Sequence, residues 1–324
     1  MRVTNRSEIN LPLAVWLLHD EYDYIDLENY ISVTTLMKPL KQILLPKRIP
    51  LTEQTSDVED YISRALGHAI HDSVEKAWTK GHARAMKLLG YPKSVIDRIL
   101  INPSPEALKA ASDPIPVYME QRGFKEITVA GRTFTIGGKF DMVADGELYD
   151  NKSTTAYSWL FGGKDEDYSR QGSLYRWLHD DKIFGDQIHI NFIFTDWQKM
   201  QARSNPNYPQ KRVASRSFNL ASVADTEAWI RAKLELLIRF WDAPEEDMPE
   251  CSDKELWRSA STYKYYKDPA KTDGRSTKNF DTLLEANTHR ATMGVGVVKT
   301  VPGEVKACGY CPAFPVCKQK EKYL

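Results

Sequence analysis

Apolar side chains between residues 57 and 89 recur at the spacing of an α-helix. The positions that form the apolar stripe are Ile62, Leu66, Ile70 and Val74. Residues three or four apart share one face of a helix, so this pattern predicts a long helix with a single apolar stripe. Further helices are predicted for residues 225–241, where the pattern is again amphipathic, and for residues 169–180, with Ser169 as the N-cap.

Between the predicted helices at residues 57–89 and 169–180, the periodicity changes to that of β-strands. Four successive short strands are predicted, at residues 125–130, 132–136, 138–144 and 147–152. Turn-forming pairs separate them, namely Ala130-Gly131, Gly137-Gly138 and Asp145-Gly146. Strict alternation predicts another strand at residues 187–195, followed by a return strand at 213–220. The order helix, strands, helix, strand indicates an α/β fold.

The acidic stretch Pro244–Glu250 is bracketed by prolines and is the best candidate for a linker. It predicts an N-terminal segment (residues 1–56), a core (57–243) and a C-terminal module (244–324) that packs on the core. A chain of 324 residues is long enough for one large domain with such an appended unit.

The composition, 42% hydrophobic and 27% charged, is that of a soluble globular protein. No apolar run reaches the roughly 18–20 residues that span a bilayer. The apolar patch from Leu11 to Leu18 contains Pro12 and lacks a small-residue cleavage site, which argues against a signal peptide. We therefore expect a cytoplasmic protein without a membrane partner.

The charges are balanced, with 44 Lys and Arg against 44 Asp and Glu, but they are unevenly distributed. Residues 198–216 and 38–48 contain basic residues and no acidic residue. Such stretches can neutralise phosphates, although each can also be ordinary solvated surface. The nucleic-acid contacts predicted from the first stretch, with the tyrosine available to stack on a base, are Lys199, Arg203, Tyr208, Lys211 and Arg212.

Two acids and a lysine stand close together on the predicted strands. If residues 138–144 and 147–152 form a hairpin, Asp141 and Asp150 meet at one end of it, and Lys152 shares a face with Asp150. Two carboxylates and an ammonium are costly on an apolar sheet unless something compensates them. A Mg²⁺ or Mn²⁺ ion is one such compensation, and a structural salt bridge on a surface hairpin is the simpler alternative.

Polar residues four apart also mark one face of two helices. In the first helix Gly67, His71 and Glu75 share a strip, and in the later one Gln171 and Tyr175 do. Each pair alone is typical of an ordinary helix surface.

Together, G-x-x-x-H-x-x-x-E, G-x-x-D, D-x-K and Q-x-x-x-Y, in this order, resemble the RecB-like nucleases of the PD-(D/E)XK superfamily. The motifs extend from Gly67 to Tyr175. The resemblance implies a restriction-endonuclease-like core, a mixed sheet flanked by helices, and metal-dependent cleavage of DNA. The middle acid is Asp150, where many members of the superfamily have glutamate.

The resemblance also implies a role for each matching residue. His71, Asp141, Asp150 and the backbone carbonyl of Asn151 would bind Mg²⁺ or Mn²⁺. Lys152 would be the catalytic lysine, and Glu75 would support the helix or the residues behind the metal ligands. The remaining two matches, which would line the site and position the DNA strand, are Gln171 and Tyr175.

Three of the four cysteines cluster near the C-terminus as C-x2-C-x5-C, and one lies apart. Cysteines spaced in this way suit a four-thiolate site that holds either Zn²⁺ or a [4Fe–4S] cluster. The four are Cys251, Cys308, Cys311 and Cys317. The triplet resembles the one that holds a [4Fe–4S] cluster in AddB and in the CRISPR-adaptation nucleases. Those relatives take their fourth ligand from near the N-terminus, where this chain has no cysteine, so Cys251 enters by elimination.

These resemblances predict a DNA exonuclease that acts on single-stranded or duplex ends, in phage or bacterial recombination or DNA processing within a bacterial cell. A recombinase or a single-strand-binding protein is a further candidate partner. The alternatives are an endonuclease, a CRISPR-type end-trimming nuclease and a non-catalytic iron–sulfur protein that binds DNA. No G-x-x-x-x-G-K-[ST] loop occurs, so the sequence carries no Walker-type motor.

Overall fold

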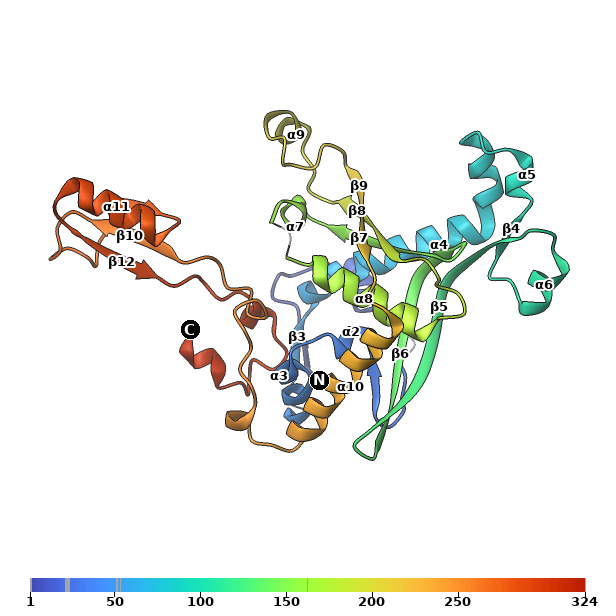
Figure 1. The fold of residues 1–324 in the computed structure, drawn as a ribbon, viewed down its shortest axis with the longest axis horizontal. Helices are drawn as coiled ribbons and strands as arrows, with labels where there is room; N and C mark the ends of the chain where they lie inside the picture. Colours follow the sequence, from blue (N-terminus) through green and yellow to red (C-terminus); the bar gives the residue numbers. More distant parts are fainter. Residues whose placement is uncertain (1, 21–23, 51, 53, 162, 324) are drawn as a thin grey trace. The chain divides into compact units, whose positions relative to one another are not determined.

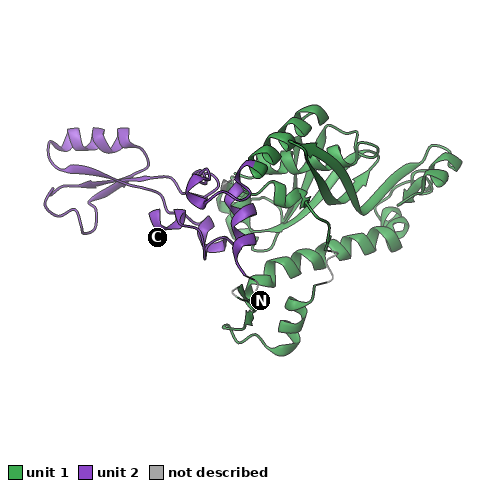
Figure 2. Cartoon of the chain, turned by 90° about the horizontal axis from the view of Figure 1, so that it is seen from below, with its two compact units in different colours: residues 1–38, 51–238 green, residues 39–50, 239–324 purple. Residues whose placement is uncertain are grey.

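The computed structural model describes residues 2–20, 24–50, 52, 54–161 and 163–323. The chain forms two compact units, which Figure 2 shows in different colours. Unit 1 comprises residues 1–38 and 51–238, and unit 2 comprises residues 39–50 and 239–324.

Unit 1 is built on a mixed seven-stranded sheet with the order β4-β5-β6-β7-β8-β9 and with β2 paired to β6. The β4–β5, β7–β8 and β2–β6 pairs are parallel, and the other pairs are antiparallel. The strands are β2 (Tyr30–Ser32), β4 (Ile99–Ile101), β5 (Ile115–Val129), β6 (Arg132–Ala144), β7 (Glu147–Thr154), β8 (Gln187–Phe194) and β9 (Val213–Asn219). A separate parallel pair is formed by β1 (Arg2–Thr4) and β3 (Thr55–Asp57).

Helices flank this sheet, as Figure 1 shows. The helix α8 (Asp165–Leu178) contacts β5, β6, β8 and β9, whereas α4 (Ile62–Leu88) contacts β5 and β7. The others in unit 1 are α1 (Leu11–Leu18), α2 (Val33–Leu36), α5 (Lys93–Ile96), α6 (Pro105–Ala110), α7 (Ala156–Phe161), α9 (Lys199–Ser204) and α10 (Val223–Phe240), whose last two residues belong to unit 2.

The core lies where these helices meet the sheet. Along β8 buried and half-buried residues alternate without exception, and the buried side chains include Ile188, Ile190 and Phe194. Leu174 and Trp177 of α8 are buried with them. The predicted α/β fold is thus confirmed at the level of a mixed sheet flanked by helices. Among the described residues, no helix combines the length and hydropathy needed to cross a membrane.

Elements with an uninterrupted periodic pattern were predicted closely. The helices α4 and α10 and the strands β8 and β9 lie within a few residues of their predicted bounds. The start of α8 was wrong, because the helix begins one turn earlier than Ser169. That residue lies inside the helix, and its hydroxyl donates a hydrogen bond to the Asn219 carbonyl at 2.5 Å.

The turn predicted at Gly137-Gly138 was also wrong, because β6 runs through both glycines without a break. Close packing, not a turn, accounts for them. A Cβ at Gly137 would lie 2.6 Å from a ring carbon of Tyr30, and one at Gly138 would lie 2.8 Å from a methyl of Val33. The strand before it, β5, begins at Ile115, ten residues earlier than predicted.

Unit 2 gathers two segments that are distant in sequence. It contains α3 (Leu40–Leu44), η1 (Leu45–Arg48), η4 (Glu245–Asp247), β10 (Thr262–Tyr266), β11 (Lys278–Phe280), α11 (Leu283–Met293), β12 (Val297–Val301), η5 (Ala307–Tyr310) and η6 (Gln319–Lys322). The stretch Pro244–Glu250 is not a free linker, because Glu245 is 7% exposed and pairs with buried Lys41 at 2.9 Å. The predicted N-terminal segment, residues 1–56, is therefore divided between the two units.

Candidate metal and catalytic centre

Three carboxylates form one row across three neighbouring strands of unit 1. The antiparallel register of β5 and β6 places Glu120 opposite Asp141. One residue beyond the Met142–Tyr149 pair, the register of β6 and β7 places Asp150 opposite Asp141. Directly opposed residues of antiparallel strands project from the same face, where like charges destabilise a sheet. The row therefore calls for positive charge on this face.

The backbone at Glu120 departs from regular β-structure. Its φ is +52°, in the left-handed region that residues other than glycine seldom occupy, and no ladder pairing is made at this position. Such backbone strain persists only where the surrounding structure holds it, and it concentrates at functional sites. Glu120 is held on one side by Lys139, whose Nζ lies 2.7 Å from its Oε2.

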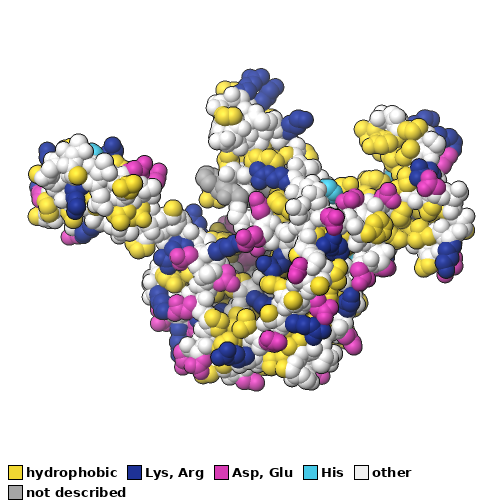
Figure 3. Space-filling model, viewed as in Figure 1, with side chains coloured by type: hydrophobic (Ala, Val, Ile, Leu, Met, Phe, Trp, Pro, Cys, Tyr) yellow, Lys and Arg dark blue, Asp and Glu magenta, His cyan; other side chains and the backbone are white. Residues whose placement is uncertain are grey.

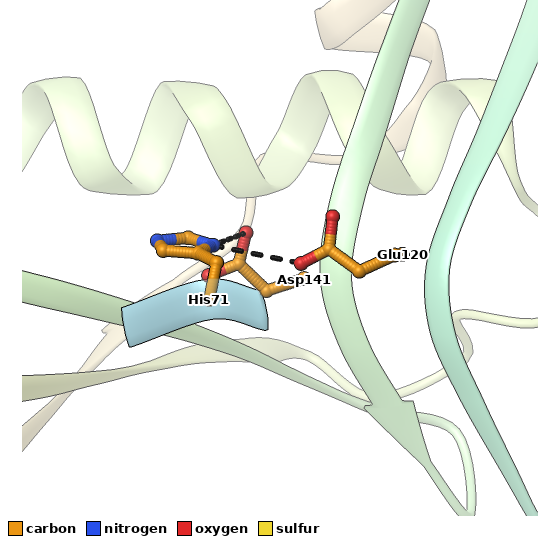
Figure 4. Close-up of side chains that lie close together, drawn as sticks. All are labelled: His71, Glu120 and Asp141. Carbon is orange, nitrogen blue, oxygen red and sulfur yellow. Dashed lines mark ion pairs between the residues drawn. The ribbon is translucent and has the colours of Figure 1, made fainter. Parts of the chain in front are cut away.

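His71 of α4 supplies part of the positive charge. Figure 4 shows its ring in contact with the carboxylates of Glu120 and Asp141. Its Nδ1 lies 3.3 Å from Asp141 Oδ1 and 3.5 Å from Glu120 Oε1. One donor atom from each of these three residues lies within 4.8 Å of the others, a separation that permits them to share a metal ion. Hydrogen bonds to Asp141 and then Glu120 raise the pKa of His71 to about 10, so without a metal the ring carries the cation.

The backbone of Asn151 links the histidine to the carboxylates. Its N–H donates to Asp141 Oδ2 at 2.9 Å, and its carbonyl oxygen lies 3.1 Å from His71 Nε2. An imidazole that binds a metal through one nitrogen commonly donates its other N–H to such a carbonyl. The Asn151 carbonyl, predicted as a metal ligand, thus contacts the ring of a predicted ligand.

Asp150 and Lys152 form the other half of the site. Asp150 is 1% exposed, and its Oδ1 and Oδ2 lie 2.8 and 2.7 Å from Lys152 Nζ. The Nε2 of Gln171 donates to Asp150 Oδ1 and to the Tyr175 hydroxyl, at 3.2 Å in each case. The structure therefore brings these four predicted residues together, beside the group of His71, Glu120 and Asp141.

Burial and the neighbouring charges together set the pKa values of Asp150 and Lys152. Burial raises the pKa of Asp150 to about 6, against the opposing effect of the Lys152 ammonium. Burial also opposes charge on Lys152, but the Asp150 and Asp141 carboxylates outweigh it and raise the pKa of that amine. Lys152 therefore stays an ammonium at neutral pH, held beside the carboxylate row.

Sequence reasoning missed Glu120, because the predicted strands began only at residue 125. Its signal was an acid directly after the apolar pair Tyr118-Met119, at a position that a longer strand would place opposite Asp141. Glu75, assigned a supporting role, is half-buried one turn beyond His71 and does not belong to the group of possible metal ligands. Gly67, in the same motif, has open space where a Cβ would lie.

The four cysteines are all in unit 2 and form no disulfide. Burial raises the pKa of Cys251 to about 12, and the charges of Glu255, Cys317 and Cys311 add to the shift. The Gln319 side chain also fastens Cys251, accepting from its N–H at 2.9 Å and donating to its carbonyl at 3.0 Å. Among the described residues, however, no three thiols come within 4.8 Å of one another.

The residues predicted to contact nucleic acid differ in their exposure to solvent. Lys199, Arg203, Lys211 and Arg212 are exposed on the arm between β8 and β9, and Figure 3 shows Lys and Arg side chains at the end of this arm. Tyr208 is 4% exposed, and its hydroxyl accepts from Gln198 N at 3.0 Å, so its ring is not presented for stacking.

Three of the four basic residues in the second stretch, 38–48, are engaged within unit 2; the fourth, Lys38, belongs to unit 1. Lys41 pairs with Glu245, the Lys47 amine lies 4.2 Å from the centre of the Trp241 ring, and Arg48 donates to the carbonyls of Trp241 and Ala243. These cations stabilise the fold of unit 2 and are not available as a group to neutralise phosphates.

No protein-family model and no curated protein matches this chain. A comparison with solved structures finds the crystal structure of SSO0001, with 16% sequence identity and a TM-score of 0.45. The match covers 73% of this chain and 88% of that one.

Proposed function

We propose that this chain is a Mg²⁺- or Mn²⁺-dependent deoxyribonuclease with a RecB-like PD-(D/E)XK core, which hydrolyses phosphodiester bonds at DNA ends. The observation that carries the proposal is the row of Glu120, Asp141 and Asp150 beside the ammonium of Lys152. The motif order from Gly67 to Tyr175 supports the same assignment, and a role in phage or bacterial recombination follows from the resemblance.

The residues fit a hard divalent cation. Carboxylate oxygens and an imidazole nitrogen are ligands that Mn²⁺ accepts, and Mg²⁺ takes carboxylates with several waters. His71, Glu120 and Asp141 already place three donor atoms within 4.8 Å. These three residues would hold the ion, with Asp150 next to them in the row. When bound, such an ion polarises a phosphate and lowers the pKa of a coordinated water.

The other residues have separate tasks in this proposal. Lys152, kept as an ammonium, would offset the negative charge that develops on the phosphate during attack. Gln171 holds Asp150 Oδ1 from one side while Lys152 holds it from the other, which fixes the orientation of that carboxylate. Tyr175 shares the Gln171 amide and would line the path of the strand.

The test compares cleavage of end-labelled single- and double-stranded DNA by the full chain with Mg²⁺, with Mn²⁺ and with a chelator. Asp150→Asn should abolish cleavage, and Lys152→Met should lower it by roughly 10² to 10³, the range found when one charge-stabilising donor is removed. Asp145→Asn is a matched control, because Asp145 is exposed in the turn between β6 and β7. Full activity of Asp150→Asn, or equal cleavage without metal, would overturn the proposal.

A circular DNA substrate separates the two modes of cleavage. An enzyme that acts on ends leaves a closed circle intact and degrades the linearised form. Cleavage of both forms would show an endonuclease instead, with the same residues at the centre.

For the thiols of unit 2 we propose a [4Fe–4S] cluster, with Zn²⁺ as the alternative. The fit rests on four free cysteines in one unit and on the two hydrogen bonds by which Gln319 fastens the Cys251 segment to the tail after Cys317. Such a group would be structural, because it would join the distant segments of the unit. Iron analysis and a broad absorption band near ~400 nm distinguish the cluster from zinc.

A further inference from the structure

Residues 262–301 of unit 2 form a small module of three strands and one helix that no part of the nuclease proposal uses. The antiparallel sheet has the order β11-β10-β12. Figures 1 and 2 both show α11 along one side of this sheet. The Tyr265 and Phe280 rings lie 4.9 and 5.1 Å from the His289 ring of α11, and Tyr265 is fully buried. This side is therefore the apolar core of the module.

The middle of the other face of the same sheet is polar and basic, whereas Tyr266, Val297 and Val301 lie towards the ends of that face. Side chains alternate along a strand, so Lys264 projects away from the face that holds its neighbour Tyr265. The register pairs Lys264 with Asn279 on one side and with Lys299 on the other. These three residues form a row across all three strands, which we call the lysine row.

The lysine row places like charges directly opposite each other. Two opposed lysines on neighbouring strands destabilise a sheet in the absence of an anion. Lys299 is 48% exposed, and the acidic residue with which it pairs, Asp273, is fully exposed and 3.8 Å away. Lys264 makes no ion pair with any described residue. The charge of the row is therefore left largely uncompensated by the fold.

The module as a whole also carries a net positive charge. Residues 262–301 contain seven Lys and Arg against four Asp and Glu, whereas the whole chain has 44 of each. The rest of the chain is thus slightly acidic, with 37 basic and 40 acidic residues. A local excess on a face without apolar side chains at its centre suits a polyanion better than an apolar partner.

We propose that the lysine row is a phosphate-binding surface for nucleic acid, separate from the carboxylate centre in unit 1. That the nucleic acid is DNA rests on the proposed function. Neighbouring strands lie about 4.8 Å apart, so the row covers about 10 Å, enough for two successive phosphates of one strand. The surface would hold the substrate by its backbone without reading its sequence.

The test is fluorescence anisotropy with the full chain and a labelled oligonucleotide of about 20 nucleotides, longer than the site of one small domain. No divalent cation is added, so that binding is measured without cleavage. Lys264→Gln/Lys299→Gln should weaken binding about tenfold and reduce the slope of log K against log salt by about 1.4 for single strands or 1.8 for duplex.

The matched control removes two charges from the same module away from the row. Lys278 is paired with Tyr265 and so belongs to the helix side of the sheet, and Arg290 lies on α11. Lys278→Gln/Arg290→Gln should leave binding within about twofold of wild type and preserve most of the salt slope. Equal losses in the two double variants, or an unchanged affinity in the first, would refute the lysine row.

A labelled polyglutamate peptide provides the competing occupant. If the row variant loses the peptide but keeps the oligonucleotide, the face binds an acidic protein segment and the proposal fails. None of these measurements depends on cleavage. A chain without nuclease activity can therefore still show binding that depends on the lysine row. Failure here and failure of the proposed function are thereby distinguishable.

Discussion

Glu120 on β5 lies directly opposite Asp141 on β6, and the two carboxylates share one imidazole, that of His71. Without a metal, the protonated ring and Lys139 provide the only positive charges recorded in contact with Glu120 among the described residues. The protonated His71 ring and a divalent metal ion would therefore compete for the same carboxylate oxygens of Glu120 and Asp141.

Glu120→Gln should weaken metal binding while it relieves repulsion in the metal-free protein. We expect the apparent affinity for Mn²⁺ to fall at least tenfold, since a charged ligand is lost, and the melting temperature without metal to stay equal or rise. Ligand stabilisation follows RT ln(1 + [L]/Kd), so the increase in melting temperature with Mn²⁺ should shrink. Glu126→Gln, an exposed position on the same strand, is the control. An unchanged response to Mn²⁺ would remove Glu120 from the site.

Two glycines in the motif region should respond to alanine in opposite directions. At Gly138 a Cβ would lie 2.8 Å from Val33 and 2.9 Å from the Tyr175 ring, so Gly138→Ala should destabilise by about 1–3 kcal/mol. At Gly67, inside α4, nothing lies within 4 Å, so Gly67→Ala should stabilise by about 0.5–1 kcal/mol. Urea denaturation measures both changes. Loss of cleavage by a stable Gly67→Ala protein would instead show that DNA approaches the helix there.

His179 should make folding sensitive to acid. Burial lowers its pKa from 6.5 to about 4, with Lys182 acting in the same direction, and its ring packs edge-on to Phe140 at 4.7 Å. Between pH 6.5 and about 4, His179 binds a proton in the unfolded chain but stays neutral in the folded chain. The stabilisation is therefore complete above pH 6.5 and is lost progressively as the pH falls towards 4.

The urea midpoint, followed from pH 7.5 to 4.5, measures this loss. His179→Phe should show a shallower decline than wild type, because the ring that must stay neutral has been removed. His68→Phe, at an exposed position of α4, should decline in parallel with wild type. Parallel curves for wild type and His179→Phe would contradict the assignment of the slope to His179.

Cys251→Ser tests the membership of the distant cysteine. If the four thiols hold one cluster, anaerobically purified Cys251→Ser should lose most of its iron and its absorption near ~400 nm, as Cys311→Ser should. The expected structural consequence is that unit 2 becomes sensitive to proteases. Ser252→Ala, next to Cys251, is the matched control. A Cys251→Ser protein with unchanged iron and absorption would leave only the C-terminal triplet as ligands.

Several elements of this protein follow from local repetition along the chain. The apolar stripe of α4 and the alternation of β8 predicted both elements. In β8 the alternation matches the burial of one face, whereas in α4 the stripe residues Ile62 and Leu66 remain exposed. The sequence also placed Asp150 and Lys152 on one side of a strand, a consequence of geometry two residues apart. Four more residues of the candidate site, His71, Asp141, Gln171 and Tyr175, were predicted from the order of the motifs and their resemblance to the RecB-like nucleases.

Which distant residues face one another depends on the packing of the folded chain. Glu120 joins the site because the β5–β6 register places it opposite a residue 21 positions away, and Gly137 and Gly138 are glycines because Tyr30 and Val33 pack against them. Glu245 is buried for the same kind of reason, through Lys41, 204 positions earlier. Local propensity reports the conformation that each segment prefers, whereas these contacts depend on how separate segments pack, which no single segment encodes.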